Sequence, residues 1–350
     1  QGRLDHGPRG KGDRKGVTDA PDLPDDDETF EPDQPGERII EITPDDAGGR
    51  LDKVLAGRLA ELSRGRVQAL MAAGMAVRGY RPVIDFMFSD FMTLAFDPVV
   101  NFASKFVTMY GQRKQLSMVL RSANGGYVGY GPTHSQSMQK YFFGIPNLSV
   151  YEMTPFHDNK QVFSRMFAEG RPCMFFEEKT TYGEKVFYEG QDAQKGRVSD
   201  FFSYTLKGKD GNWAVLSPDE EEKPELAILC PGGLNKMAAE AASRLLLEEE
   251  ISARIYIPSR LYPCGIAEIY SELREIGRIL VAEECTEGSG WGDVVLHECS
   301  VQGIEHGPVG HIMLLASRPE VIPANYRLER RMLVSEDEIF DAAKKLSEMD

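Results

Sequence analysis

Residues Arg81 to Met92 read RPVIDFMFSDFM, and this stretch decides how the chain is organised. Pro82 to Phe88 is an apolar run typical of a buried strand, and residues 91–109 can form an amphipathic helix. Strand-like and helix-like segments then keep alternating. Further strands are predicted at 116–121, 150–153 and 173–177, further helices from Ser135 and at 159–168, and a Gly-rich loop at 125–132. This alternation predicts an α/β fold with helices packed on a largely parallel sheet.

A second α/β unit is predicted after residue 224. The range 191–224 contains the acidic run Asp219 to Glu222 and is interpreted as a linker between domains. A final helix is expected near Ser335, where Glu338 three residues later completes a capping box. Residues 225–350 are therefore expected to form a separate domain. Its predicted strands are 226–230, 253–257, 279–283 and 311–316, and its first predicted helix is 235–249.

The first 77 residues have a different character. Residues 1–38 carry 6 basic and 11 acidic residues and few aliphatic ones. They are predicted to be a disordered acidic tail, because such a segment cannot bury enough apolar surface to offset its ordering entropy. Residues 39–77 contain a strand-like run from Ile39 to Ile42, followed by helical spacing from Leu51 to Leu62. A second helix is expected to begin at Ser63, a good N-cap residue.

The composition of the whole chain excludes several classes of protein. A formal net charge of −15 over 350 residues argues against binding nucleic acid through the overall electric field. No stretch approaches the length of apolar sequence that a transmembrane helix needs. The five cysteines are scattered and form no C-x-x-C pair, which argues against a zinc site or a disulfide framework. We therefore expect a cytoplasmic protein.

Four motifs resemble those of a known family. They are RPVIDFMFSDFM, GYGPTHSQS (Gly129 to Ser137), PCMFFEEKTTYG (Pro172 to Gly183) and GRILVAEECTEGSGWGD (Gly277 to Asp293). In this order they resemble the beta subunit of thiamine-diphosphate-dependent 2-oxo acid dehydrogenases acting on pyruvate, branched-chain 2-oxo acids or acetoin. The resemblance covers 78–350. It implies a transketolase-like pyrimidine-binding domain at 78–190, truncated at its amino end, and a transketolase C-terminal domain at 225–350.

The same resemblance implies the chemistry. Such an enzyme decarboxylates a 2-oxo acid on thiamine diphosphate and transfers the acyl group to lipoamide. In this family the beta subunit supplies the pyrimidine half of the cofactor site, and an alpha subunit holds the diphosphate and magnesium. The expected assembly is an α2β2 heterotetramer that works with a lipoyl-bearing acyltransferase core. No metal ligand is expected within this chain.

Two residues are candidates for the site. His134 follows the Gly-rich loop, and the family's corresponding histidine lies at the active centre, where an imidazole can exchange protons near neutral pH. Phe91 resembles the aromatic residue that packs on the aminopyrimidine ring of the cofactor. Spacing alone allows plainer interpretations, because His134 could cap a loop and Phe91 could be a core residue at a strand-to-helix corner.

One residue that the family needs is missing. Thiamine catalysis uses a glutamate beside the pyrimidine ring, and a gap-free count back from the RPV motif places Gly65 at its position. Glu61 is the only carboxylate between Lys53 and Ile84 in the sequence, and it belongs to a different motif. We therefore expect little or no activity, because removing a buried acid/base group usually costs orders of magnitude in rate.

Residues 49–74 resemble a different family, the S-four RNA-binding domain of pseudouridine synthases. Arg50, Lys53, Arg64 and Arg66 match the positions that contact RNA phosphates there. The strands that would close this domain do not follow, so 39–77 is interpreted as a truncated fragment. Two alternative functions therefore stay open: RNA binding through this fragment, and a catalytically silent subunit that only assembles with an alpha partner. A solvated helix pair is the plainer interpretation of the basic cluster.

Overall fold

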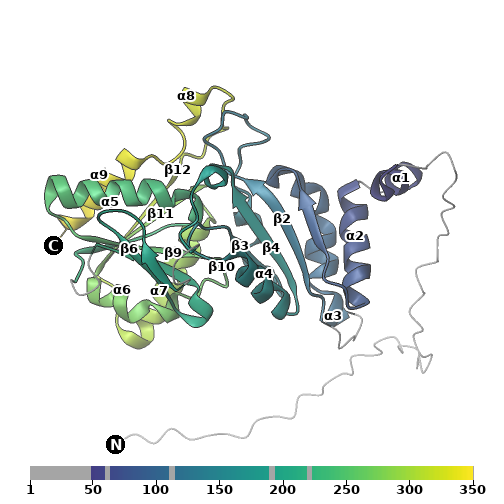
Figure 1. Ribbon diagram of the computed structural model, residues 1–350, viewed down its shortest axis with the longest axis horizontal. Coiled ribbons are helices and arrows are strands. Elements are labelled where there is room, and N and C mark those ends of the chain that lie inside the picture. Colours follow the sequence, from purple (N-terminus) through teal and green to yellow (C-terminus); the bar gives the residue numbers. More distant parts are fainter. Residues whose placement is uncertain (1–48, 60–63, 110–114, 189–193, 219–222, 350) are drawn as a thin grey trace, which may run out of the picture. The chain divides into compact units, whose positions relative to one another are not determined.

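The computed structural model describes residues 49–59, 64–109, 115–188, 194–218 and 223–349, which belong to one compact unit (Figure 1). The predicted acidic tail and the predicted strand at Ile39 to Ile42 lie outside these residues. No helix within the described ranges is long and apolar enough to span a membrane. The helices are α1 (Leu51–Arg58), α2 (Arg64–Val77), α3 (Phe106–Met109), α4 (Asn159–Ala168), α5 (Asn235–Glu249), α6 (Tyr270–Ile276), α7 (Trp291–His306), α8 (Tyr326–Glu329) and α9 (Glu336–Ser347).

The strands and the short helical turns complete the described structure. The strands are β1 (Val83–Phe86), β2 (Met118–Asn124), β3 (Ser149–Glu152), β4 (Pro172–Glu178), β5 (Lys195–Arg197), β6 (Ser203–Lys207), β7 (Trp213–Ser217), β8 (Leu226–Leu229), β9 (Ala253–Pro258), β10 (Arg260–Tyr262), β11 (Arg278–Thr286) and β12 (His311–Ser317). The turns are η2 (Ser89–Ala95), η3 (Pro98–Ala103), η4 (Gln139–Phe142), η5 (Lys179–Gly183), η6 (Lys209–Gly211), η7 (Gly232–Leu234) and η8 (Ile266–Glu268).

The first sheet has the strand order β1-β2-β4-β3-β10. β1, β2, β4 and β3 are parallel to one another, as the alternation of strands and helices predicts. Strand β4 is buried along its whole length, which its apolar sequence allows because both of its faces are covered. Cys173 and Phe175 pack against Val162 and Met166 of α4, whereas Met174 and Phe176 belong to the core on the other side.

The second sheet has the order β12-β11-β8-β9-β7-β6-β5. β12, β11, β8 and β9 are parallel, and β7, β6 and β5 continue the sheet in antiparallel fashion. Helices α5 and α9 lie on one face and α6 and α7 on the other (Figure 1). The expected α/β fold with two sheets is therefore confirmed.

The two sheets are connected by strand pairing and by a shared apolar core, and not only by the chain between them. Strand β10 follows β9 in the chain but pairs antiparallel with β3 of the first sheet. One apolar core also includes side chains of both sheets, among them Met174 and Phe176 from the first, and Trp213 and Ile279 from the second. Side chains of the second sheet therefore help to support the first sheet.

The range predicted as a linker, 191–224, is structured in its described part. It carries β5, β6 and β7, which extend the second sheet. Tyr204, Trp213 and Leu216 are buried in these strands. The Gly- and Lys-containing segment Lys209–Gly211 is the turn between the antiparallel strands β6 and β7. The linker was predicted from the Gly, Asp and Lys residues of the range and from the acidic run that ends it, although the apolar, fully buried sequence of β7 lies between them.

Two predicted helices differ from the structure. The segment 91–109 is divided into η2, η3 and α3, with η3 beginning at Pro98 and a turn at Ser104 and Lys105 separating it from α3. Pro98 lacks the N–H that a regular helix would use. The helix expected from Ser135 is only the turn η4. Its first residues are engaged elsewhere, because Gly125 N donates to Gln136 O and Met138 N donates to Asn124 Oδ1.

Helix α2 packs into the first α/β unit. Ala72 and Ala76 are buried in the same core cluster as Ile84 and Phe86 of β1. Helix α1 is connected to α2 by Gln68 Nε2, which donates to Asp52 Oδ2 at 2.6 Å. The boundary expected at residue 77 is therefore not a boundary in packing, since α2 forms part of the core beneath β1.

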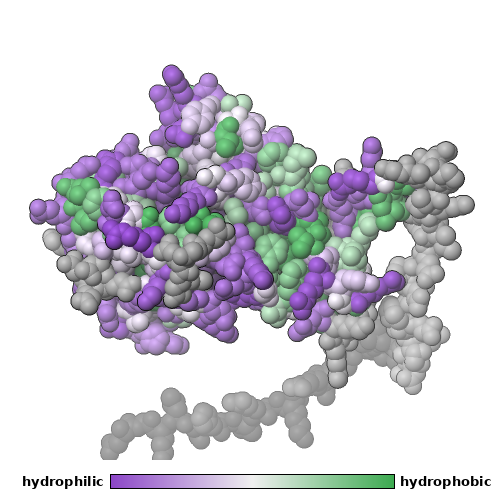
Figure 2. All heavy atoms as spheres, in the orientation of Figure 1, coloured by the Kyte–Doolittle hydropathy of each residue, from purple (hydrophilic) through white to green (hydrophobic). Residues whose placement is uncertain are grey.

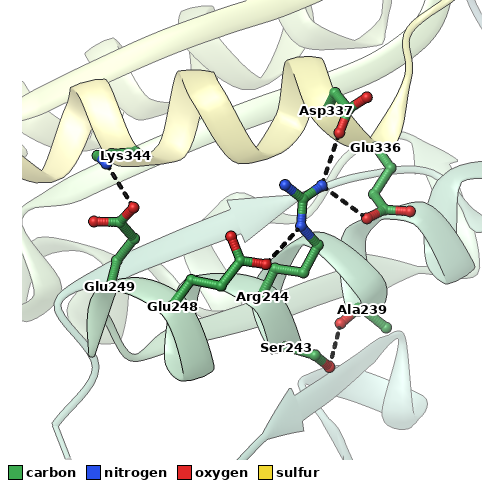
Figure 3. Close-up of polar contacts among 8 residues, drawn as sticks. All are labelled: Ala239, Ser243, Arg244, Glu248, Glu249, Glu336, Asp337 and Lys344. Carbon is green, nitrogen blue, oxygen red and sulfur yellow. Dashed lines mark hydrogen bonds and ion pairs between the residues drawn. The ribbon is translucent and has the colours of Figure 1, made fainter.

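Helices α5 and α9 are held together by a charged network above their shared apolar core (Figure 3). Arg244 of α5 donates to Glu336 and Asp337 of α9, and its guanidinium lies 4.3 Å from the ring centroid of Phe340. The predicted capping box at the start of α9 is confirmed, because Glu338 N donates to Ser335 Oγ and Ser335 N donates to Glu338 Oε2.

Candidate active site

The side chains around His134 come from three segments at one edge of the first sheet. The corner after β1 supplies Phe88 and Phe91, the loop after β2 supplies Tyr130 and His134, and the corner after β4 supplies Lys179. Because β1, β2 and β4 are parallel neighbours, their carboxyl ends meet at the same edge. The fold thus assembles residues that are far apart in sequence.

The loop between β2 and His134 depends on glycine and on the second sheet. Gly125 and Gly129 have φ angles of +79° and +75°, a region that residues with a side chain rarely adopt. Gly126 N donates to Glu284 Oε1 at 2.6 Å, and Gly129 N donates to Glu329 Oε2 at 2.7 Å. Two buried carboxyl groups from the second α/β unit therefore fix the path of this loop.

His134 lies between two aromatic rings. Its ring centroid is 4.9 Å from that of Phe88 and 5.3 Å from that of Phe91, both in edge arrangements. Phe91 is 38% exposed, and His134 is half-buried. The Nδ1 atom of His134 is 2.9 Å from Thr133 Oγ1. The structure therefore brings together the two site residues that the sequence predicted, and neither is fully buried.

Lys179 places a positive charge beside His134, Phe88 and Tyr130. Its Nζ donates to the backbone oxygen of His134 at 2.7 Å and lies 5.3 and 5.9 Å from the ring centroids of Phe88 and Tyr130. Burial lowers the pKa of Lys179, and the nearby carboxyl groups, first Glu178, oppose this effect.

Three carboxyl groups are buried behind Lys179, between the two sheets. Gln139 Nε2 donates to Glu152 Oε2 at 2.9 Å and to Glu178 Oε1 at 3.0 Å, and Asn124 also donates to Glu178. Burial raises the pKa of Glu152, Glu178 and Glu284. Repulsion from Glu178 raises the pKa of Glu152 and Glu284 further. All three carboxyl groups line a small cavity at the junction of the sheets.

The glutamate expected beside the cofactor has no replacement at its own position, because Gly65 lies in the first turn of α2. The carboxylate nearest to Phe91 in sequence is Asp90, which is buried. Its Oδ1 accepts a hydrogen bond from Gln136 Nε2 at 2.6 Å, while Oδ2 has no hydrogen-bond partner. Asp90 thus supports the corner that carries Phe91. In the described part of the chain, no group of three His, Cys, Asp or Glu side chains is arranged to hold a metal ion.

The predicted RNA-contacting residues do not form one described cluster. Arg50 pairs with Asp52 at 3.1 Å, and Lys53 is exposed on α1. The side chains of Arg64 and Arg66 lie outside the described part of the structure. Another histidine, His157, is buried. It contacts Thr154 and the backbone oxygen of Gly211, and burial lowers its pKa to about 3.

Sequence reasoning missed Lys179 and the buried carboxyl groups. A usable signal was present, because Glu178 and Lys179 follow directly on the apolar run of β4, and Glu283 and Glu284 interrupt the apolar run of β11. Charged residues at the carboxyl ends of buried parallel strands often lie at a site. Their convergence depends on how the two sheets face each other, which the sequence pattern does not contain.

Apolar side chains are exposed next to the site. Figure 2 shows them gathered over the part of the molecule where Figure 1 labels β2 and α2. The exposed members in the segment 83–96 are Val83, Met87, Phe91, Leu94 and Phe96. Met87 is 74% exposed, which is unusual for a large apolar side chain and typical of a surface that a partner covers.

Comparison with known proteins identifies the first unit. The family description "Transketolase, pyrimidine binding domain" matches residues 68–185, so the match begins within α2. A solved structure described as a split gene transketolase, inactive beta4 tetramer, shares the fold at a TM-score of 0.59 and 17% identity. That match covers 82% of this chain and 82% of the other.

Curated relatives extend the similarity to most of the chain. The acetoin:2,6-dichlorophenolindophenol oxidoreductase subunit beta of Bacillus subtilis is 28% identical, over 71% of this chain and 70% of the relative. The mitochondrial pyruvate dehydrogenase E1 component subunit beta-2 of Oryza sativa subsp. japonica is 26% identical, over 79% of this chain and 69% of the relative. The chain is therefore similar to these two beta subunits over most of its length, and its residues 68–185 match a transketolase pyrimidine-binding domain.

Proposed function

We propose that the chain is the beta subunit of a thiamine-diphosphate-dependent component that decarboxylates a 2-oxo acid and transfers the acyl group to lipoamide. The observation that carries this proposal is the position of His134 between Phe88 and Phe91, at the carboxyl edge of a sheet whose sequence matches a pyrimidine-binding domain. In this function His134 would hold or move a proton at the reacting centre.

The residues of the site fit one half of the cofactor. The exposed ring of Phe91 offers a flat apolar face to an aminopyrimidine. When bound, thiamine diphosphate supplies the electron sink that stabilises the carbanion left by decarboxylation. The diphosphate and its magnesium ion would be held by an alpha subunit.

The apolar surface of segment 83–96 supports the proposed partner. Met87 and Leu94 are 74% and 58% exposed and lie on either side of Phe91 in sequence. An alpha subunit seated there would remove these side chains from water and close the site around His134. We propose an α2β2 assembly that delivers acyl groups to a lipoyl-bearing acyltransferase core.

The chain is proposed to have low activity. Gly65 has no side chain to replace the glutamate that activates the cofactor, and Asp90 is already bonded to Gln136. The deficit is expected to be on the order of 10²–10⁴ in rate, the usual contribution of a positioned acid/base group.

The test combines the full chain with a cognate alpha subunit, thiamine diphosphate, magnesium and pyruvate. We expect saturable cofactor binding by calorimetry, weaker binding for Phe91→Ala, and slow decarboxylation that Gly65→Glu accelerates. His134→Asn should lower the remaining rate, while His297→Asn, on the distant α7, should not. Failure to bind the cofactor with an alpha subunit present would overturn the proposed function. Decarboxylation at a rate typical of E1 enzymes without Gly65→Glu would overturn the claim of low activity.

A further inference from the structure

Lys179 lies beside His134 but has no part in holding the cofactor or moving a proton in the proposed function. It is the first residue after β4, so its backbone is fixed by a fully buried strand. Its side chain crosses to the loop after β2 and donates to the backbone oxygen of His134 at 2.7 Å. No ion pair of Lys179 is found among the described residues within 4.0 Å. This hydrogen bond is therefore the direct link between β4 and the backbone of His134.

The loop has few other local restraints at this point. His134 N donates to Gly131 O at 3.2 Å, and Thr133 and Pro132 are exposed. The carboxyl groups that hold the loop act farther back, at Gly126 and Gly129. Without Lys179, the stretch from Gly129 to His134 would be held by ring packing of Tyr130 on Phe88 and of His134 on Phe88 and Phe91. The next restraint along the chain is at Gln136, which is hydrogen-bonded to Gly125, Ser89 and Asp90.

We propose that Lys179 is a positioning residue for His134, holding the imidazole at the distance from Phe91 that the proposed reaction needs. This inference rests on the proposed function only for its effect on catalysis; the restraint on the loop is a property of the chain alone. A charged N–H donor suits this task, because a hydrogen bond from an ammonium group to a carbonyl is stronger than one between neutral groups.

The surroundings explain how a partly buried ammonium is tolerated. The rings of Phe88 and Tyr130 face it at 5.3 and 5.9 Å, which are distances of favourable cation–π contact. Carboxyl groups of Asp90, Glu178, Glu284 and Glu329 add long-range attraction. Phe88 therefore contacts both Lys179 and His134, so the cation, the shared ring and the imidazole form one cluster.

The first experiment measures amide hydrogen exchange in the full chain without partner or cofactor. Lys179→Met keeps the length and apolar stem of the side chain and removes the donor, and Lys179→Arg restores a donor. We expect exchange in peptides spanning 125–138 to rise roughly tenfold in Lys179→Met, corresponding to about 1.4 kcal/mol, and to return most of the way in Lys179→Arg. Peptides from α5 should not change. Lys185→Met, at an exposed lysine nearby, is the matched control.

The second experiment measures kinetics with the alpha subunit, using a Gly65→Glu background if the unmodified chain is too slow. A misplaced His134 should lower kcat roughly 10- to 100-fold with little change in KM for pyruvate, and Lys179→Arg should recover part of the loss. A purely structural role of Lys179 would lower the amount of folded enzyme without this split between kcat and KM.

The outcomes separate the two proposals. If Lys179→Met is folded by circular dichroism and its exchange at 125–138 equals that of the parent chain, Lys179 does not position the loop, whatever the enzyme does. If exchange rises but the parent enzyme neither binds cofactor nor turns over with an alpha subunit, the proposed function fails while the loop restraint stands. Should Lys179→Met not fold, Lys179→Leu serves as the second variant without a donor, and the same exchange comparison decides.

Discussion

Glu283 offers a test of how burial controls charge between the two sheets. Its carboxyl is 1% exposed, and Oε2 accepts a hydrogen bond from Trp291 N at the start of α7, at 2.7 Å. Burial raises its pKa to about 7, from an ordinary value of 4.5. The folded protein therefore binds this proton more tightly than the unfolded chain. The stabilising contribution of Glu283 is complete below pH 4.5 and is lost as the pH rises towards 7.

Glu283→Gln removes this titration and keeps an oxygen for Trp291 N. A shift of roughly 2.5 pKa units corresponds to about 3 kcal/mol, so the variant should exceed the parent chain in unfolding free energy by about 1–3 kcal/mol at pH 8. The difference should fall to about 1 kcal/mol or less at pH 5, where the folded protein still keeps this proton. The assay is urea unfolding at pH 5, 6.5 and 8, followed by the fluorescence of Trp291 and its neighbour Trp213.

Glu275→Gln on α6 is the control for Glu283, because Glu275 is exposed. Its effect on the urea midpoint should stay small at every pH. A stability difference between Glu283→Gln and the parent chain that is the same at pH 5 and pH 8 would refute the reasoning, since only a titrating carboxyl produces the dependence on pH.

Three further predictions concern stability. Gly125→Ala should lower the melting temperature and destabilise the fold by about 2–4 kcal/mol, because its φ is +79° and the new Cβ would overlap Glu178. Arg244→Ala should lower the urea midpoint, and salt should reduce this loss only in part, because contact with Phe340 is lost along with the ion pairs. Asp52→Ala should speed hydrogen exchange in α1, since its link to α2 is removed.

A specific result would contradict each of these three predictions. Gly144→Ala, at φ +74° with open space around the position, should cost only about 1–2 kcal/mol, and an equal loss at both glycines would show that the overlap with Glu178 does not matter. If high salt removed the whole loss of urea midpoint in Arg244→Ala, the contact of Arg244 with Phe340 would contribute nothing to stability. For Asp52, unchanged exchange in α1 would show that the helix is held by other contacts.

The elements that sequence reasoning predicts well are those with a continuous pattern. Helix α5 begins and ends where its periodicity predicts, and α9 begins at the predicted capping box. Strands β2 and β4 were found within a few residues because buried parallel strands read as apolar runs. The prediction for segment 191–224 was wrong because its strands are only three to five residues long and are flanked by Gly-, Lys- and Asp-containing turns and an acidic run.

In the site, too, residues within a local motif were predicted and residues brought there by tertiary packing were not. His134 and Phe91 were predicted from motifs, and the structure brings their rings within 5.3 Å. Lys179 was within a quoted motif, but its role depends on a backbone oxygen 45 residues earlier, which no local pattern indicates. Glu284 comes from the other sheet, so its approach to Gly126 is a result of tertiary packing alone.

Strand β10 has a consequence for dividing this protein into parts. Its residues Arg260–Tyr262 occupy the edge of the first sheet beside β3. A fragment that ended after β4 or β7 would leave β3 with unpaired backbone N–H and C=O groups along a fully buried strand sequence. Such an edge pairs readily with another copy of itself, so that fragment should aggregate. Studies of the pyrimidine-binding unit should therefore use the chain at least through Tyr262, or supply β10 as a peptide.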